Sequence, residues 1–378
     1  AAFYQCRHKS APNSASVAHR SIGRYPITWR GKLKENENQA EAVDYFFDRL
    51  RAPIPSNARV LLFRPPPGYA PFPNLDPAHI RFCETDIVAA SRLESLGFKS
   101  FETQEDGFDL VVVFATKHKE EVLYHLSLGL DALGPQGEIV LVAANDLGAQ
   151  SLERKLTELL SGPLQVVSKH KCRIVRVRLN EVDINESLKL EWRNHGQMQK
   201  LPVTGLYSCP GVFSWKKIDE GSRWLADSLP PDLQGDGADL GAGVGYLSMR
   251  AAEKAQNIQS INLFESERKA LDAARLNLGD FGGAVQFRYT WADVREGIGA
   301  AEYDFILMNP PFHQGKNEER GLGQVFVQKA LQSLKPRGRL FMVANRHLAY
   351  EALIEASGGE QVDCEYGKGF KLIRAVKR

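Results

Sequence analysis

The stretch that decides the fold runs from residue 238 to residue 245 and reads Ala238-Asp239-Leu240-Gly241-Ala242-Gly243-Val244-Gly245. It follows a turn at Asp236 and Gly237 and precedes a predicted helix that begins near Tyr246. Glycines at this spacing let a strand turn tightly into a helix and let a ligand approach the backbone closely. The stretch therefore predicts the first strand–loop–helix unit of a doubly wound α/β domain with a ligand at the loop; the alternative is a plain turn.

Two acidic residues downstream of this loop suit the recognition of an adenosine. Glu265 ends the apolar run Ile261 to Phe264, where a doubly wound fold places a carboxylate that binds both hydroxyls of a ribose. Asp293 follows a predicted strand that begins at Val285, and its carboxylate is placed to accept a hydrogen bond from an adenine amino group. Glu265 also fits the acidic start of a helix.

The residue before the first glycine favours S-adenosylmethionine over a nicotinamide dinucleotide. That position is usually apolar in dinucleotide enzymes, whereas here it is Asp239. An aspartate there supports the loop and lies near the cationic amino-acid tail of the cofactor. We therefore predict an S-adenosylmethionine site formed by Asp239, Gly241, Gly243, Gly245, Glu265 and Asp293.

A second motif, Asn309-Pro310-Pro311-Phe312-His313-Gln314-Gly315, follows the predicted strand 305–308. Two consecutive prolines end that strand and leave Asn309 at its carboxyl tip, the edge where ligands bind in open α/β sheets. An exocyclic amine on a base is a poor nucleophile. Hydrogen bonds to the Asn309 side-chain oxygen and the Pro310 carbonyl would turn its lone pair toward a methyl sulfonium. We assign the catalytic site to Asn309, Pro310, Pro311 and Phe312.

Two residues of this motif are candidates for substrate binding. Phe312 offers a stacking face for the base, worth about 1–3 kcal/mol. His313 either contacts the base or the RNA, or caps the following loop. No Ser/His/Asp grouping or histidine cluster elsewhere suggests a competing chemistry, and no cysteine–histidine spacing predicts a metal site.

The chain repeats one pattern of strands and helices at an offset of roughly 195 to 201 residues. Each copy reads as apolar strands alternating with amphipathic helices, which predicts a mainly parallel sheet covered on both faces. The constant offset predicts two copies of one α/β fold in tandem. The three matched pairs of apolar runs are 110–114 with 305–308, 138–143 with 339–344, and 173–177 with 371–376.

The first copy lacks both motifs of the second. Ala115-Thr116-Lys117-His118 stands where the second copy has its asparagine and prolines, and the stretch 62–68, with three prolines, stands where the second has its glycine loop. We therefore predict that the first copy is inactive. The predicted division is a basic extension over 1–34, a degenerate domain over 35–180, a polar linker over 181–200 and a catalytic domain over 201–378.

Length and composition bound the remaining possibilities. The 378 residues are 43% hydrophobic, enough for two separate cores, and no apolar run approaches the roughly 20 residues that cross a bilayer, so we predict a soluble protein. Five scattered cysteines favour a reducing compartment. The acid-free stretch 1–34 is a solvated tail, a phosphate-contacting arm or a remnant of an organelle-targeting segment.

In its second half the chain resembles the bacterial ribosomal RNA guanine-N2 methyltransferases that carry two tandem methyltransferase-like domains. The resemblance implies two Rossmann-like class I methyltransferase domains, the first degenerate and serving RNA binding or folding. It also implies S-adenosylmethionine as cofactor and the N2 amine of a guanine in ribosomal RNA as acceptor. The stretches that carry it are 206–214 with Pro210-Gly211-Val212-Phe213-Ser214, 239–245, 309–315, 344–348 and 370–375.

The resemblance carries expectations about partners and place as well. We expect ribosomal RNA or a ribosomal subunit particle as partner, no membrane, no metal and a monomer, in the bacterial cytoplasm or, alternatively, in a mitochondrial or plastid matrix. Methylation of adenine N6 or of a glutamine amide is an alternative activity, because those methylases share the Asn-Pro-Pro core. A non-catalytic assembly factor that kept the fold is another. Candidate phosphate contacts in the first copy are Lys117, Lys119, Lys169, Lys171 and Arg173.

Overall fold

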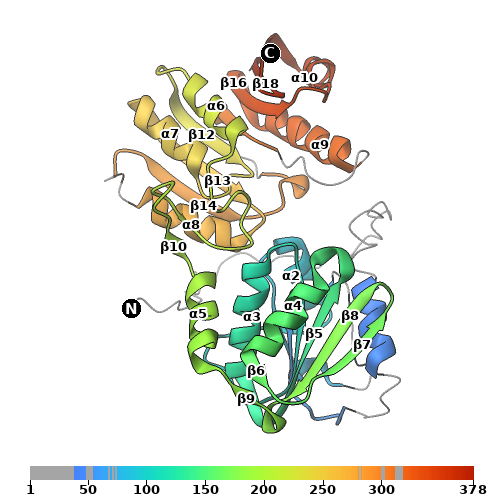
Figure 1. The fold of residues 1–378 in the computed structure, drawn as a ribbon. Helices are drawn as coiled ribbons and strands as arrows, with labels where there is room; N and C mark the ends of the chain where they lie inside the picture. Colours follow the sequence, from blue (N-terminus) through green and yellow to red (C-terminus); the bar gives the residue numbers. More distant parts are fainter. Residues whose placement is uncertain are drawn as a thin grey trace, which may run out of the picture.

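The computed structural model of the chain contains two seven-stranded sheets that have the same strand order (Figure 1). The structure describes residues 38–47, 54–66, 69, 72, 75–279, 281, 283–298, 303–310 and 318–378. The basic extension 1–34 lies outside the described residues. None of the described helices is long and apolar enough to cross a bilayer.

The first domain is built on strands in the order β3-β2-β1-β4-β5-β8-β7. The strands are parallel except β8 and β7, which run antiparallel to their neighbours. Its elements are a helix over 38–47, β1 (Val60–Phe63), η1 (Pro77–His79), β2 (Ile80–Cys83), α2 (Ile87–Ser95), β3 (Lys99–Ser100), β4 (Phe108–Phe114), α3 (Lys119–Ala132), β5 (Leu133–Ala144), η2 (Asn145–Leu147), α4 (Ala149–Leu159), β6 (Leu160–Ser161), β7 (Gln165–Lys169) and β8 (Cys172–Arg178).

The second domain repeats that order as β14-β13-β12-β15-β16-β18-β17. Here too the last two strands, β18 and β17, are antiparallel to their neighbours. Its elements are β10 (Gln199–Lys200), β11 (Tyr207–Ser208), α6 (Glu220–Ser228), β12 (Gln234–Leu240), α7 (Tyr246–Lys254), β13 (Asn257–Glu265), α8 (Arg268–Leu278), β14 (Gln286–Trp291), η4 (Val294–Glu296), β15 (Tyr303–Met308), α9 (Glu318–Ser333), β16 (Leu334–Asn345), α10 (Glu351–Ala356), β17 (Gly359–Gly367) and β18 (Phe370–Lys377).

The identical strand orders confirm the predicted duplication and the doubly wound α/β class. Strand β4 shows why the sequence forms such a sheet, since Val111, Val112 and Val113 are all fully buried. Val111 and Val113 belong to one hydrophobic core, on the side of α3, and Val112 belongs to the core on the other face. A strand covered on both faces carries continuous apolar residues rather than an alternating pattern.

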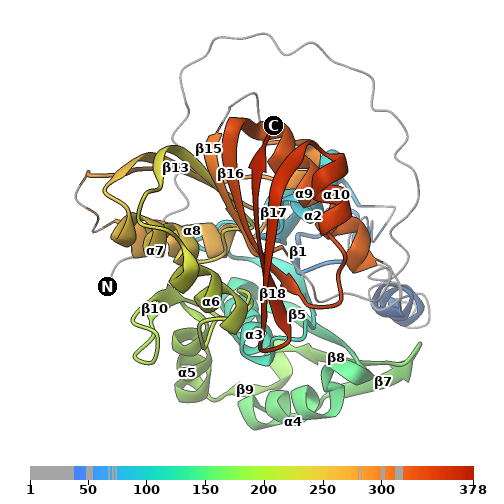
Figure 2. The same cartoon turned by 90° about the horizontal axis from the view of Figure 1, so that it is seen from above.

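The segment 181–200 departs from the predicted linker, because most of it is ordered structure of the first domain. After η3 (Leu179–Glu181), strand β9 (Asp183–Ile184) pairs with β6, and α5 (Glu186–Gly196) lies against α3 in both views (Figures 1 and 2). Trp192 is only 4% exposed, within the core that also contains Leu126 and Val122. Most of α5 is polar apart from Trp192, the partly buried Leu188 and the exposed Leu190, so the sequence suggested a linker.

Candidate active site

The glycine loop lies at the point where the strand order of the second sheet reverses. Strand β12 has β13 on one side and β15 on the other, and in doubly wound folds ligands bind at the carboxyl ends of such a pair. The three glycines of the loop have φ values of 70° at Gly241, 55° at Gly243 and 80° at Gly245. Residues that carry a side chain rarely adopt these φ values, which explains why the sequence has glycine at each of the three positions.

Two glycines of the loop differ in the space around them. A Cβ at Gly243 would meet no atom of the described residues within 4 Å, whereas a Cβ at Gly245 would lie 3.1 Å from both Ala274 and Leu278 of α8. Gly243 therefore faces open space, and Gly245 allows the start of α7 to pack closely on α8. The open side is a cavity whose lining includes Gly241, Gly243, Tyr246, Asp219, Ser222 and Asn309.

Asp239 supports the loop from behind. Its carboxyl group is fully buried and accepts hydrogen bonds from the Ser248 hydroxyl at 2.7 Å and the Ser248 amide at 3.2 Å. Burial raises the pKa of Asp239 to about 7, although the bonds from Ser248 act in the opposite direction. The second oxygen, Oδ1, is buried without a hydrogen-bond partner among the described residues. Asp239 is not one of the described residues that line the cavity, so it braces the loop and the start of α7.

Glu265 ends β13 and reaches the same loop. Its Oε2 accepts a hydrogen bond from the Gly243 amide at 2.8 Å, and its Oε1 accepts one from the Glu267 amide at 2.8 Å. Burial raises the pKa of Glu265, while these backbone amides lower it. Since each carboxylate oxygen has two lone pairs, both oxygens keep capacity for a further donor such as a hydroxyl group.

Asp293 lies at the end of the next strand, beside Glu265, because Glu265 pairs in register with Trp291 of β14. Its carboxylate caps η4 and forms an ion pair with Arg295 at 2.7 Å. The sequence predicted that this carboxylate accepts a hydrogen bond from an adenine amino group. In the structure it is paired with the Arg295 guanidinium. Any adenine contact of Asp293 must therefore share the carboxylate with Arg295.

Asn309 follows β15 and is held by the start of α6. Its Nδ2 donates to Asp219 Oδ2 at 3.0 Å and to Ser222 Oγ at 2.7 Å. Asp219 is also the N-cap of α6, since it accepts a bond from the Ser222 amide at 2.8 Å. A carboxylate only accepts hydrogen bonds, so the amide nitrogen of Asn309 is the end that faces Asp219. The amide oxygen is consequently the accepting end that remains, and no described residue donates a hydrogen bond to it, so it is available to a donor in the cavity that Asn309 lines.

The sequence did not identify Asp219 and Ser222 as site residues. The stretch Asp219-Glu220-Gly221-Ser222 carries the signal of an ordinary helix start, and nothing in it refers to a residue some ninety positions later. Pro310 is buried at the end of β15. Pro311, Phe312 and His313 lie outside the described residues. Within the described part of the chain, no group of His, Cys, Asp and Glu side chains could hold a metal ion.

Comparisons with known proteins agree with this geometry. The family model named Methyltransferase small domain matches residues 204–374, and Methyltransferase small domain N-terminal matches residues 81–192. Three bacterial relatives are named Ribosomal RNA small subunit methyltransferase C. That of Psychromonas ingrahamii is 31% identical (72% of this chain, 77% of the relative), that of Shewanella piezotolerans 30% (77% and 83%), and that of Escherichia coli O81 30% (78% and 84%).

A solved structure shares the whole architecture. It is described as the T. thermophilus 16S rRNA N2 methyltransferase RsmC in complex with AdoMet and guanosine. It superposes with a TM-score of 0.74 over 93% of each chain, at 22% sequence identity. At this identity the match supports the tandem fold of both domains.

Proposed function

The chain belongs to the family of ribosomal RNA small subunit methyltransferases C, and on that premise we propose that it methylates the N2 amine of a guanine in small-subunit ribosomal RNA. It is a methyltransferase whose methyl donor is S-adenosylmethionine. The observation that carries an amine as acceptor is the orientation of Asn309, which lines the cavity beside the glycine loop and donates from its Nδ2 to Asp219 and Ser222, so that its amide oxygen remains to accept from an amine. The choice of guanine follows the T. thermophilus 16S rRNA N2 methyltransferase, whose structure holds guanosine.

The residues at the loop fit S-adenosylmethionine. Among the described residues, Gly243 leaves open space for a ligand, and Glu265 lies beside it with lone pairs left for a hydroxyl group. We propose that Gly241 and Gly243 contact the cofactor through their backbone, that Glu265 binds its ribose, and that Gly245 and Asp239 hold the loop in shape. Asp293 would contact the adenine beside its ion pair with Arg295. When bound, S-adenosylmethionine supplies an electrophilic methyl group.

In this proposal Asn309 and Pro310 orient the acceptor. The amide oxygen of Asn309 accepts a hydrogen bond from one N–H of the guanine amine, and the Pro310 carbonyl accepts one from the other. The amine lone pair is then directed at the methyl group, and most of the rate comes from this alignment. The proton leaves the methylated nitrogen for water after transfer, so Asn309 need not act as a base.

The guanine must be unpaired or flipped out of a helix before it can enter the cavity. We propose that Phe312 stacks on the base and that His313 contacts the base or the neighbouring RNA. Mass analysis separates this proposal from methylation of adenine N6, because the two products differ as nucleosides.

We propose that the first domain is inactive and binds RNA. Lys117 and Lys171 are exposed, whereas Lys119 donates to Ser151 at 2.8 Å and Arg173 pairs with Glu153 at 2.7 Å. Lys169 lies 5.0 Å from the centre of the Tyr45 ring. Lys117 and Lys171 are therefore the stronger candidates for phosphate contacts. We further propose that the chain acts as a monomer where ribosomes are assembled, in the bacterial cytoplasm or in an organelle matrix.

The proposal is tested on small ribosomal subunits from cells that lack the modification. Subunits and naked ribosomal RNA are each incubated with the full chain and S-adenosylmethionine, and the RNA is digested and analysed as nucleosides by mass spectrometry. We expect N2-methylguanosine to appear. Methyl groups on adenine or on a ribosomal protein, or no transfer to either substrate, would overturn the proposal.

A further inference from the structure

The first domain carries an arginine at the position of the first loop glycine. Arg64 follows β1 as Gly241 follows β12, and both have positive φ, 51° and 70°. The Arg64 amide donates to the Cys83 carbonyl at 3.0 Å, and the Gly241 amide donates to the Phe264 carbonyl at 2.8 Å. The same backbone corner is thus kept in both copies, and in the first copy it carries a long cationic side chain.

Glu84 holds the position of Glu265 in the first copy. It follows β2 directly and accepts hydrogen bonds from the amides of Thr85 at 2.7 Å and Asp86 at 2.9 Å. Its Oε1 also forms an ion pair with Arg64, and the two side chains are 7% and 12% exposed. The acid that would bind a ribose in the first copy is therefore neutralised by Arg64.

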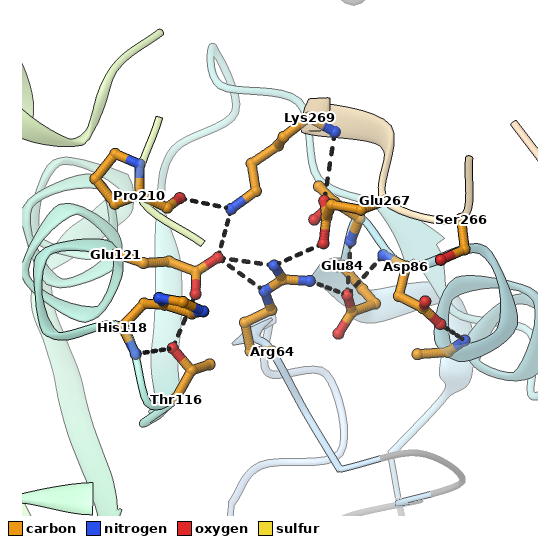
Figure 3. A network of polar contacts seen from close by, with 12 residues as sticks. Arg64, Glu84, Asp86, Thr116, His118, Glu121, Pro210, Ser266, Glu267 and Lys269 are labelled. Carbon is orange, nitrogen blue, oxygen red and sulfur yellow. Dashed lines mark hydrogen bonds and ion pairs between the residues drawn. The ribbon is translucent and has the colours of Figure 1, made fainter. Parts of the chain in front are cut away.

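The same arginine reaches the second domain (Figure 3). Its Nη2 lies 2.7 Å from Glu121 Oε1 of α3 and 3.1 Å from Glu267 Oε2 of the second domain. Lys269 of α8 joins from the other side, 2.5 Å from Glu121. Burial alone would raise the pKa of Glu121, but Arg64 and Lys269 hold it well below its usual range. Two cations and three carboxylates thus form one network across the domain boundary.

Glu267 follows the proposed ribose ligand, Glu265, by two residues, and the backbone around it is also tied to the first domain. The Ile87 amide donates to the Ser266 carbonyl at 2.9 Å, and the Arg268 amide donates to the Thr85 carbonyl at 2.8 Å. The Trp291 indole nitrogen donates to the Ser266 carbonyl at 2.8 Å and to Thr85 at 3.2 Å. The segment that ends β13 and begins α8 is therefore held from outside its own domain.

The network also reaches the other wall of the cavity. Lys269 Nζ donates to the Pro210 carbonyl at 3.0 Å, and Gly211 is packed so tightly that a Cβ there would collide with Lys269 and Glu121. The chain continues from Gly211 to Phe213 and Ser214, which line the cavity. Glu121 and Lys269 thus support both the ribose side and the 210–214 side of the proposed cofactor site.

We propose that the former cofactor pocket of the first domain has become a docking socket that positions Glu265 and the 210–214 loop of the second domain, with Arg64 as the positioning residue. The inference rests on the proposed role of Glu265 in cofactor binding. Removal of the Arg64 charge leaves Glu84 and Glu267 without their ion-pair partner and Lys269 as the one cation beside three carboxylates of the network, and a buried carboxylate without its partner is strongly disfavoured. The ion pair that joins Arg64 to the second domain is then lost, and the segment that carries Glu265 and Glu267 is no longer held in one position.

The test compares Arg64→Met with Arg178→Met in the full chain. Arg178 is an arginine of the same domain that is 49% exposed and pairs with Glu138 and Glu181, so its loss should leave the socket intact. Calorimetric titration with S-adenosylmethionine should give a Kd raised about tenfold for Arg64→Met, within the range of 5- to 150-fold typical of coupled sites. The kcat at saturating cofactor should change much less than the Kd, because Asn309 is held by Asp219 and Ser222 rather than by the Arg64 network. Arg178→Met should bind as the unmodified chain does.

A second variant keeps the inference open to refutation if Arg64→Met does not fold. The pair Glu121→Gln with Lys269→Met removes one charge of each sign and should raise the same Kd, with faster amide hydrogen exchange over 266–271. Two failures are distinguishable. If the unmodified chain does not bind S-adenosylmethionine, the proposed function fails. If it binds, Glu265→Ala loses binding, and each socket variant that folds binds normally, the docking inference is wrong.

Discussion

A primary amide has a donating end and an accepting end, and Asn309 orients an amine only if its accepting end faces the cavity. Asp219 and Ser222 decide this orientation, because both take hydrogen bonds from the Asn309 Nδ2. In the proposed mechanism the residue that orients the amine is therefore itself oriented by two neighbours that line the same cavity. Their role is the positioning of one side chain, and a change in either should appear in the rate of transfer rather than in cofactor affinity.

Asp219→Ala should lower kcat by about 100-fold, since small misplacements of aligned groups cost that much. It should also cost about 1 kcal/mol of stability, because α6 loses its N-cap. Steady-state kinetics at saturating S-adenosylmethionine, with thermal unfolding beside it, measures both effects. Asp219→Asn is the matched control, because its side-chain oxygen still caps α6 and accepts from Asn309. An equal loss of kcat in both variants would contradict the orienting role.

Asp239 should make the stability of the chain depend on pH. Its pKa is raised by burial from 3.8 to about 7, so the folded chain holds this proton more tightly than the unfolded chain. The stabilising contribution is complete below the unfolded value and is lost as the pH rises to about 7, at about 1.4 kcal/mol for each unit of difference. Asp239→Asn removes the titration. Melting temperatures of the two proteins should diverge from pH 4 to 7 and run parallel above it; parallel curves throughout would count against a buried, neutral Asp239.

At the scale of elements, the turn from β12 into α7 needs space on two sides. Gly243 must leave room on the cavity side, and Gly245 must leave room on the side of α8. Positive φ is common to both, but only the first position is expected to touch a ligand. The two glycines can therefore be separated by what a methyl group at each one disturbs.

Gly243→Ala should weaken S-adenosylmethionine binding while the melting temperature changes little beyond the cost of positive φ, about 1–2 kcal/mol. Gly245→Ala should lower the melting temperature more, because its Cβ lies 3.1 Å from Ala274 and Leu278. Gly369→Ala measures the cost of positive φ alone, because a Cβ at Gly369, where φ is 84°, would meet no described atom within 4 Å. Thermal unfolding and calorimetry on the three variants check this order. Equal cofactor binding in Gly243→Ala and Gly369→Ala would mean that Gly243 does not face the ligand.

At the scale of the whole molecule, α5 assigns the connecting segment to the first domain. Trp192 is buried in the first domain's core, so Trp192→Ala should cost about 3–5 kcal/mol. We expect an early unfolding transition of the first domain by calorimetry, with the second domain melting near its original temperature. Leu190→Ala, on the same helix at a residue 59% exposed, should change little. If Trp192→Ala changed the stability of the first domain only slightly, residues 181–200 would be better described as a linker.

The sequence predicted the parts of the molecule that depend on local patterns. Continuous apolar runs predicted strands such as β4 and β15, the glycine spacing predicted the turn after β12, and the prolines predicted the end of β15 at Asn309. The roughly constant offset between the copies predicted the duplication. These features follow from short-range chemistry, and the identical strand orders confirm the fold they imply.

The sequence did not predict the contacts made between distant segments. Asp219 meets Asn309 only because α6 and β15 end at the same edge of the sheet, and Arg64 meets Glu267 only because the two domains dock. In the sequence Arg64 is simply a residue before three prolines, and it marked only the loss of a glycine loop. Its structural role depends on charges that lie on three other segments of the chain.

The central claim is that Asn309 directs an RNA amine at the methyl group of S-adenosylmethionine. Single-turnover methyl transfer to small ribosomal subunits, with the unmodified chain and Asn309→Ala at saturating cofactor, tests it most directly. We predict that Asn309→Ala binds S-adenosylmethionine as the unmodified chain does and transfers the methyl group at least about 100-fold more slowly. Transfer by Asn309→Ala at a rate close to that of the unmodified chain would contradict the account.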